Sequence, residues 1–262
     1  MQNVLFFGRM DAAELAFWVF FIFFLGLVIW LVREGRREGF PLESDVSGRL
    51  GSNQGLFQVP PVKVFNLPFD QGSVTTPIVE PRQPLAVPNA KRVFAGSGSP
   101  IEPVGSGIGA GIGPGAYAER SDYPDLSHDG KPRIVPIGDS EMTVVTKDRD
   151  PRGMTVYGAD GALVGTVTGI WVDRSESMIR YLDVALEPNI EAKGQAIVPV
   201  TMVLIDQGKG KVRCSALNAS QFAGAPGVAK AGIITRLEEE KIVGYFGSGY
   251  LYANEARQEP YI

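Results

Sequence analysis

The chain has 262 residues, a formal net charge of −4, one cysteine and one histidine. That length allows one or two domains. The acidic balance argues against nucleic acid as a partner, because proteins that bind it generally carry a basic surface. A single Cys214 and a single His128 exclude a disulfide framework, a cysteine-based zinc knuckle and a multi-histidine site, so no metal site is expected.

An apolar run without a charged residue extends over residues 15–32. A helix of this length, at about 1.5 Å per residue, spans about 27 Å and so nearly matches the ~30 Å hydrocarbon core of a membrane. A cleaved signal peptide is the main alternative, but acidic residues precede the run and REGRREG follows it where a cleavage site would stand. A buried core helix is disfavoured because no face is polar. We therefore expect one transmembrane helix over about 11–35.

Three arginines, Arg33, Arg36 and Arg37, follow the apolar run. By the positive-inside rule they remain in the cytoplasm, which places residues 1–10 in the periplasm and the rest of the chain in the cytoplasm. The same arginines are suited to anionic lipid headgroups, although topology alone explains them equally well.

Residues 36–116 are rich in proline and glycine, with short apolar phrases at 56–68 and 74–81. Frequent prolines forbid long helices and confine strands to sheet edges. A disordered linker would be poorer in Val, Phe and Leu, so we expect an extended segment that lies along a partner. The run GSGIGAGIGPGA (105–116) lacks the spacing of a nucleotide-binding loop and is interpreted as a flexible loop.

Residues 117–262 are expected to form a mainly β domain with one late helix. Several segments alternate or run apolar over strand lengths, with turn signals between them. Hairpin spacing without intervening helices predicts a small antiparallel barrel or sandwich. Thr235 and Glu238 form a capping box, and the helix that they open is expected to stop after about Phe246, where Gly247 and Gly249 follow. The strand segments are 165–173, 180–187, 196–206 and 211–217.

Four phrases in this order resemble the H subunit of the purple-bacterial photosynthetic reaction centre. They are REGFPLE (37–43), GPGAYAERSDYPDL (113–126), the stretch 150–184 that begins DPRGMTVYGADG, and LEEEKIVGYFGSGYLYA (237–253). The third phrase resembles the core of the PRC-barrel, a β-barrel module expected here over about 150–225. The resemblance covers nearly the whole chain and is weakest between about 45 and 105.

The resemblance implies a structural, proton-conducting subunit that is not itself an enzyme. It would cap the cytoplasmic side of the L and M subunits in the photosynthetic intracytoplasmic (inner) membrane, beside a light-harvesting antenna ring and membrane lipids. No pigment is expected on this chain alone. The complex would hold bacteriochlorophyll, bacteriopheophytin, quinones, non-haem iron and carotenoid, and the cap would exclude bulk water from the quinone while admitting protons.

Asp173, Glu176 and Arg180 match family positions near the proton route to the secondary quinone. A desolvated carboxylate there would carry a raised pKa and relay a proton near neutral pH, whereas Arg180 would favour the charged form. The plain alternative is a solvated hairpin turn with a surface ion pair worth at most ~1 kcal/mol.

Asp125, His128 and Asp129 lie where some relatives place a proton entry built from an aspartate and two histidines. This sequence departs from that pattern, because Ser127, Asp129 and Lys131 occupy the three positions. One imidazole does not make a transition-metal site. A proton-gathering surface cluster and an ordinary polar loop remain open here.

Glu239 matches another acidic family position, although its place at a helix N-terminus is a sufficient structural reason for it. Cys214 is expected to be a small core residue. The alternative function for the chain is a membrane-anchored PRC-barrel adaptor unrelated to photosynthesis. An independent enzyme finds no support, since the sequence holds no nucleophile–base pairing, metal cluster or phosphate loop.

Overall fold

The computed structural model describes residues 11–40, 42, 49, 59–77, 90–190 and 194–258. The chain forms two compact units, Met1–Ala86 with Gly96–Gly98, and Val87–Ala95 with Ser99–Ile262. Each unit is described by itself below. The expected periplasmic segment 1–10, and part of the apolar phrases in the proline-rich segment, lie outside the described residues.

The N-terminal unit begins with helix α1 (Ala12–Glu34). Asp11 caps it by accepting a hydrogen bond from the backbone N–H of Glu14 at 2.9 Å. None of its residues is buried, and its length and composition allow it to cross a membrane. A side-chain surface that is apolar on every face and covered by nothing in its own chain suits a lipid environment.

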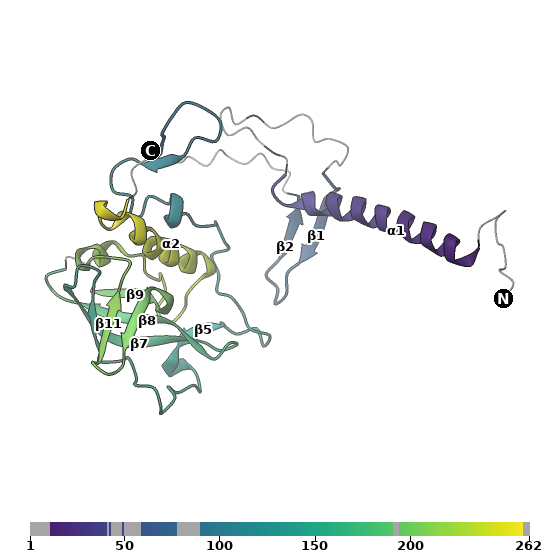
Figure 1. Ribbon diagram of the computed structural model, residues 1–262. Helices are drawn as coiled ribbons and strands as arrows, with labels where there is room; N and C mark the ends of the chain where they lie inside the picture. The colour runs from purple at the N-terminus through teal and green to yellow at the C-terminus, as the bar shows by residue number, and fades with distance from the viewer. Residues whose placement is uncertain are drawn as a thin grey trace. The chain divides into compact units, whose positions relative to one another are not determined.

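An antiparallel hairpin of β1 (Lys63–Asn66) and β2 (Ser73–Thr76) adjoins the C-terminal end of α1 (Figure 1). Arg37 links the hairpin to the end of α1. Its guanidinium donates to the carbonyl oxygens of Pro61 at 2.7 Å and Thr76 at 3.1 Å, and pairs with Glu34 at 2.8 Å. Nearly every side chain of the two strands is exposed, and these include the apolar Val64, Phe65 and Val74.

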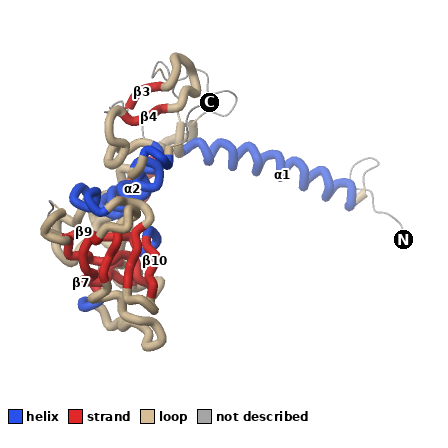
Figure 2. The backbone as a smooth tube through the Cα atoms, turned by 60° about the vertical axis from the view of Figure 1, so that its left-hand side comes forward, coloured by secondary structure: helices blue, strands red, loops and turns tan. Residues whose placement is uncertain are grey.

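The second unit is built on a seven-stranded sheet in the order β10-β11-β6-β7-β8-β9, with β5 added on β7. All pairs are antiparallel except β6 with β11, which is parallel. The sheet curls strongly (Figure 2), and its two ends are consecutive in sequence, joined by the 3-10 turn Val200–Met202. The strands are β5 (Ile134–Pro136), β6 (Thr155–Tyr157), β7 (Leu163–Asp173), β8 (Met178–Leu186), β9 (Gln195–Pro199), β10 (Val203–Asp206) and β11 (Lys211–Cys214).

This curled sheet confirms the mainly β barrel expected from the sequence, with two kinds of difference. The segment 196–206 is two strands, since the chain turns at Pro199 and crosses from one end of the sheet to the other. The short strands β5 and β6 were not predicted, because three residues are too few to display a period. Cys214 is fully buried in the core, as expected of a small apolar residue.

Helix α2 (Arg236–Tyr252) packs over the curled sheet (Figures 1 and 2), and its Ile242 and Phe246 are fully buried. The predicted capping box is present: the Thr235 hydroxyl accepts from the Glu238 N–H, and the Glu238 carboxylate accepts from the Thr235 N–H. Tyr245 in this helix donates its hydroxyl to the Gln221 carbonyl at 2.8 Å.

The predicted end of α2 was wrong, because the helix continues past Gly247 and Gly249 to Tyr252. These glycines serve close packing. A Cβ on Gly247 would lie 2.9 Å from the Pro114 carbonyl oxygen, and one on Gly249 would lie 2.5 Å from that of Ala216. The segment GPGA, which includes the 3-10 turn Gly113–Gly115, therefore lies directly against the helix.

A second small hairpin, of β3 (Ala90–Arg92) and β4 (Ile101–Pro103), precedes the glycine-rich run. Within that run Gly107 and Gly109 lie against the rings of Tyr252 and Tyr245 of α2. The run is thus a packed loop where the sequence suggested a flexible one, and glycine is needed because a side chain would overlap the Tyr252 ring.

Candidate functional site

The β7–β8 turn places two of the predicted carboxylates side by side. Asp173 is the last residue of β7 and is fully buried. Its Oδ1 accepts from the backbone N–H groups of Ser175 at 2.9 Å and Glu176 at 3.0 Å, which fixes the turn. Glu176 lies exposed on the turn, and Ser177 takes a positive φ of 53° to return the chain into β8.

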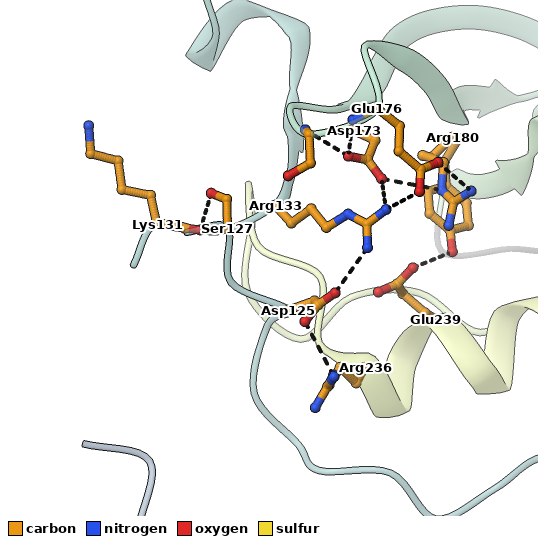
Figure 3. Close-up of polar contacts among 11 residues, drawn as sticks. Asp125, Ser127, Lys131, Arg133, Asp173, Glu176, Arg180, Arg236 and Glu239 are labelled. Atoms are coloured by element: carbon orange, nitrogen blue, oxygen red, sulfur yellow. Dashed lines mark hydrogen bonds and ion pairs between the residues drawn. The ribbon is translucent and has the colours of Figure 1, made fainter. Parts of the chain in front are cut away.

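Arg133 is the centre of the cluster, and the sequence interpretation did not single it out (Figure 3). Its Nη2 lies 2.8 Å from Asp173 Oδ2 and 2.5 Å from Glu176 Oε1, and its Nη1 lies 3.4 Å from Asp125 Oδ2. Strand β5, which follows Arg133 directly, pairs with the end of β7 in the register Ile134↔Asp173. The pairing of these strands, invisible in the sequence, brings the guanidinium to the carboxylates.

Arg180 lies farther from the carboxylates than Arg133 does. Its Nε is 4.0 Å from Asp173 Oδ2 and its Nη1 is 3.9 Å from Glu176 Oε2. Both are contacts at the limit of an ion pair. Arg180 therefore adds positive charge at the edge of the cluster, while Arg133 makes the short contacts.

The raised pKa expected for a desolvated carboxylate does not hold for Asp173. Burial raises the pKa of its carboxyl, but the Arg133 guanidinium and the backbone N–H groups of Glu176 and Ser175 together outweigh burial, so the pKa lies below its ordinary value. Asp173 Oδ2 and Arg133 Nε are nevertheless buried without a well-aligned hydrogen bond. Asp173 is thus a fixed negative charge near neutral pH.

A second layer of the cluster joins the barrel to the start of α2. Asp125 Oδ1 lies 3.4 Å from Arg236 Nη2, while its other oxygen faces Arg133. The Tyr181 hydroxyl donates to Glu239 Oε2 at 3.0 Å. The structure therefore brings together five of the predicted residues, namely Asp125, Asp173, Glu176, Arg180 and Glu239, and adds Arg133 and Arg236 (Figure 3). Tyr181 joins them through its hydrogen bond to Glu239.

Glu239 differs from Asp173 in the direction of its shift. Burial raises the pKa of the Glu239 carboxyl, and the hydrogen bond from Tyr181 and the charge of Arg180 offset this only in part. Helix position therefore does not explain Glu239 fully, because a helix N-terminus alone would lower the pKa of a carboxyl. Burial thus favours the protonated form of Glu239, whereas Arg133 and the backbone N–H groups favour the charged form of Asp173.

His128 and Asp129 stand apart from this cluster, in the turn that follows Leu126. Asp129 accepts from the Ser127 hydroxyl at 2.7 Å and from Arg174 Nη2 at 3.1 Å. The Ser127 hydroxyl, then Arg174 and the Lys131 backbone N–H, hold the pKa of Asp129 well below its usual range. His128 is exposed and lines an open groove with Asp129.

The three positions that would hold the entry set of relatives still converge in space. Ser127, Asp129 and Lys131 are linked by the Ser127–Asp129 hydrogen bond and a 3.9 Å contact between Lys131 Nζ and Asp129 Oδ2. Across the part of the chain that the structure describes, no group of three or more His, Cys, Asp or Glu side chains is arranged to hold a metal ion. The turn is thus a polar, ion-paired surface.

The three arginines after the membrane helix have different surroundings. Arg33 is exposed. Arg36 lies over the Phe40 ring, 5.0 Å from its centroid, and Arg37 is committed to Glu34 and the hairpin carbonyls. Arg33 is therefore the best placed of the three for a headgroup.

The helix, the exposed hairpin and the curled sheet with its charged turn define a membrane-anchored protein with a polar barrel domain. The family described as "Photosynthetic reaction centre, H-chain N-terminal region" matches residues 4–139, more than half of the chain, and the PRC-barrel domain matches residues 143–221. The chain belongs to the photosynthetic reaction centre H-chain family.

Membership of this family has direct consequences. The chain is a structural reaction-centre subunit and not an enzyme, it associates with the L and M subunits, and it binds no pigment of its own. The apolar helix α1 fits a single-pass membrane protein. A PRC-barrel match alone would have left room for an unrelated adaptor, but the match to the H-chain N-terminal region does not favour that alternative.

Proposed function

We propose that this H subunit caps the cytoplasmic side of the L and M subunits and helps to deliver protons to the secondary quinone. The observation that supports the proposal is the cluster around Arg133. Two carboxyls of opposite pKa behaviour lie near one guanidinium: Arg133 pairs with Asp173, whose pKa is lowered, and the charge of Arg133 also acts on Glu239, whose pKa burial raises. Pairs of titratable groups whose environments push their pKa values apart are typical of proton-handling sites.

Each side chain has a distinct part in this proposal. Glu176 is the exposed carboxylate that takes a proton from water. Asp173 is a fixed charge that lowers the cost of a proton passing nearby, and Arg133 holds both in place at short distance. Arg180 balances the charge at the edge of the cluster. Asp125, His128 and Asp129 form the outer surface, where the exposed His128 imidazole collects protons.

The cofactors in this proposal are held by the L and M subunits. They comprise bacteriochlorophyll, bacteriopheophytin, quinones, non-haem iron and carotenoid. A quinone that receives two electrons needs two protons inside a site of low dielectric, where an unpaired charge is costly. A barrel with a polar, partly exposed face meets both needs, because it excludes bulk water and still offers titratable groups.

The proposal includes an orientation and surroundings. Residues 1–10 are periplasmic, residues 11–35 span the inner photosynthetic membrane, residues 36–116 lie along L and M, and residues 117–262 form the cytoplasmic domain. The exposed Arg33, with Arg36 and Arg37 near it, supports contact with anionic lipid headgroups at the cytoplasmic surface. The antenna ring is the neighbour expected around the whole complex.

The test is Glu176→Gln in the intact reaction centre, with the second electron transfer to the secondary quinone timed after paired flashes. We expect a slower rate, because the glutamine amide takes up no proton. An unchanged rate between about pH 6 and 9 would contradict the proposal.

Asp148→Asn is the matched control, since it also removes an exposed carboxylate of the same domain, outside the Arg133 cluster. It should leave the rate unchanged. Equal slowing by both variants would indicate a general effect of surface charge and would also count against a specific role for Glu176.

A further inference from the structure

Tyr181 lies in β8 and connects the sheet to helix α2. Its side chain is 4% exposed, and its hydroxyl donates to Glu239 Oε2 at 3.0 Å. A phenylalanine would fill the same volume, so the hydroxyl is not needed to pack the ring. The hydrogen bond therefore acts on Glu239.

The Glu239 carboxyl does not cap its own helix. Its backbone N–H donates to the Thr235 carbonyl at 2.9 Å, and the N–H of Glu238 is already capped by the Thr235 hydroxyl. The neighbours on the helix are engaged elsewhere: Glu240 pairs with Arg120 at 2.6 Å, and Glu238 accepts from backbone N–H groups. Glu239 is left to face the barrel.

Charged and titratable groups act on Glu239 from two other elements. The segment before β5 contributes Asp125 and Arg133, and strand β8 contributes Arg180 and Tyr181. Both signs of charge are present, so the position of the Glu239 carboxyl decides which charges it feels. On its own helix, Arg236 pairs with Asp125, while Glu240 and Glu238 have the partners given above.

We propose that Tyr181 is a positioning residue, whose hydroxyl holds the Glu239 carboxyl against the Arg133 cluster so that Glu239 stores the proton passed inward from Glu176. This rests on the proposed function and deepens it. Tyr181 is not itself the carrier. Burial and the adjacent Glu239 raise the pKa of Tyr181 far above its ordinary value, so the phenol stays a neutral donor throughout the physiological range.

The test is Tyr181→Phe in the intact reaction centre. Two signals are followed against pH: proton uptake, measured with an indicator dye when the secondary quinone receives its first electron, and the infrared band of the protonated Glu239 carboxyl, assigned by its loss in Glu239→Gln. The Tyr181 hydrogen bond favours the ionised form of Glu239. Its loss should move both profiles to higher pH by about one unit, a tenfold change in proton affinity.

Tyr245→Phe is the matched control. Tyr245 is a partly buried tyrosine of the same domain, but its hydroxyl donates to the Gln221 carbonyl and not to an acid. It should shift neither profile, and Tyr181→Phe combined with Glu239→Gln should behave as Glu239→Gln alone. An equal shift in the Tyr245 variant, or a Tyr181 effect that persists without Glu239, would overturn the proposal.

The outcome separates the two proposals. Infrared titration of Glu239 reads its protonation at any electron-transfer rate, so the Tyr181 effect is measurable even if Glu176→Gln leaves the second electron transfer unchanged. If the Tyr181→Phe variant does not assemble into the reaction centre, Glu239→Gln still tests the proposal. It should abolish both the band and the matching part of proton uptake, and retention of that uptake would refute storage at Glu239.

Discussion

The two units of this chain differ in where they place their apolar side chains: one buries them and the other leaves them exposed. The barrel unit buries a continuous core in which Phe222, Phe246 and Leu182 are almost completely inaccessible. In the N-terminal unit, α1 buries no residue and the hairpin leaves Phe65 and Val74 exposed opposite each other. A two-stranded hairpin with exposed faces is at best marginally stable alone. The barrel buries its apolar side chains within its own core, whereas the described part of the N-terminal unit leaves them exposed.

The largest expected contrast comes from one phenylalanine in each unit. Phe246→Ala should lower the free energy of unfolding of the barrel by about 3–5 kcal/mol, because it opens a cavity in a closed core. Phe65→Ala should leave the unfolding of the purified chain unchanged and weaken its retention on L and M. Urea unfolding followed by circular dichroism, with salt washing of the assembled complex, measures both. If Phe65→Ala destabilised the barrel as much as Phe246→Ala does, the contrast between the two units would be wrong.

Ion pairs offer a second contrast. Arg133→Met leaves buried Asp173 without its counter-charge, so the free energy of unfolding at neutral pH should fall by about 2 kcal/mol after allowance for solvent screening. Lys63→Met removes an exposed partner of Glu34 and should have no measurable effect on barrel unfolding.

The direction of the Asp173 pKa shift predicts how this loss of stability depends on pH. Because the folded pKa of Asp173 is lowered, its ion pair stabilises the wild type above the unfolded value of about 3.9, and that contribution is lost as pH falls through the folded pKa. The difference in the free energy of unfolding between wild type and Arg133→Met should therefore become smaller below about pH 4. A difference that stays constant on acidification would show that Asp173 is not the group involved.

Helical glycines make a third, smaller contrast. Gly249→Ala should destabilise the barrel by about 1–2 kcal/mol, because the new methyl would lie 2.5 Å from the Ala216 carbonyl oxygen and this outweighs the gain in helix propensity. Gly26→Ala in α1 meets nothing within 4 Å and should be neutral in the purified chain. Thermal unfolding of the two variants decides the matter, and a stabilised Gly249→Ala protein would contradict the packing described here.

The smallest effect is expected at Arg37. Arg37→Ala removes the hydrogen bonds that hold the hairpin to the end of α1, so amide exchange in β1 and β2 should quicken roughly tenfold while the barrel strands remain unaffected. Hydrogen exchange read by mass spectrometry resolves the two regions. Faster exchange throughout the barrel would contradict the independence of the two units that is assumed here.

Much of this architecture could be predicted from local patterns. The long β7 and β8, the capping box at Thr235 and the apolar anchor each follow from periodicity, capping chemistry or hydropathy. The end of α2 could not, because glycine usually signals a helix terminus and only the neighbouring chain shows that it serves close approach.

The candidate site divides in the same way. Asp173 and Glu176 are close in sequence and were identified together, whereas Arg133 reaches them only through the pairing of β5 with β7. The lowered pKa of Asp173 was missed for the same reason. A sequence pattern can indicate that a carboxyl is buried, but it does not show which cation lies beside that carboxyl in the fold. Tyr181 was not singled out, because it lies in an apolar strand segment and only the packing of α2 brings Glu239 to its hydroxyl.

The parallel pairing of β6 with β11 has a consequence for how the chain is made. Thr155 pairs with Lys211, so this ladder in the middle of the sheet joins residues far apart in sequence, across all of β7 to β10. Contacts of such long sequence separation form late, because the intervening chain must be ordered first. During synthesis the anchor is complete long before residue 211 leaves the ribosome. The barrel therefore finishes folding on a chain whose apolar helix has already been made.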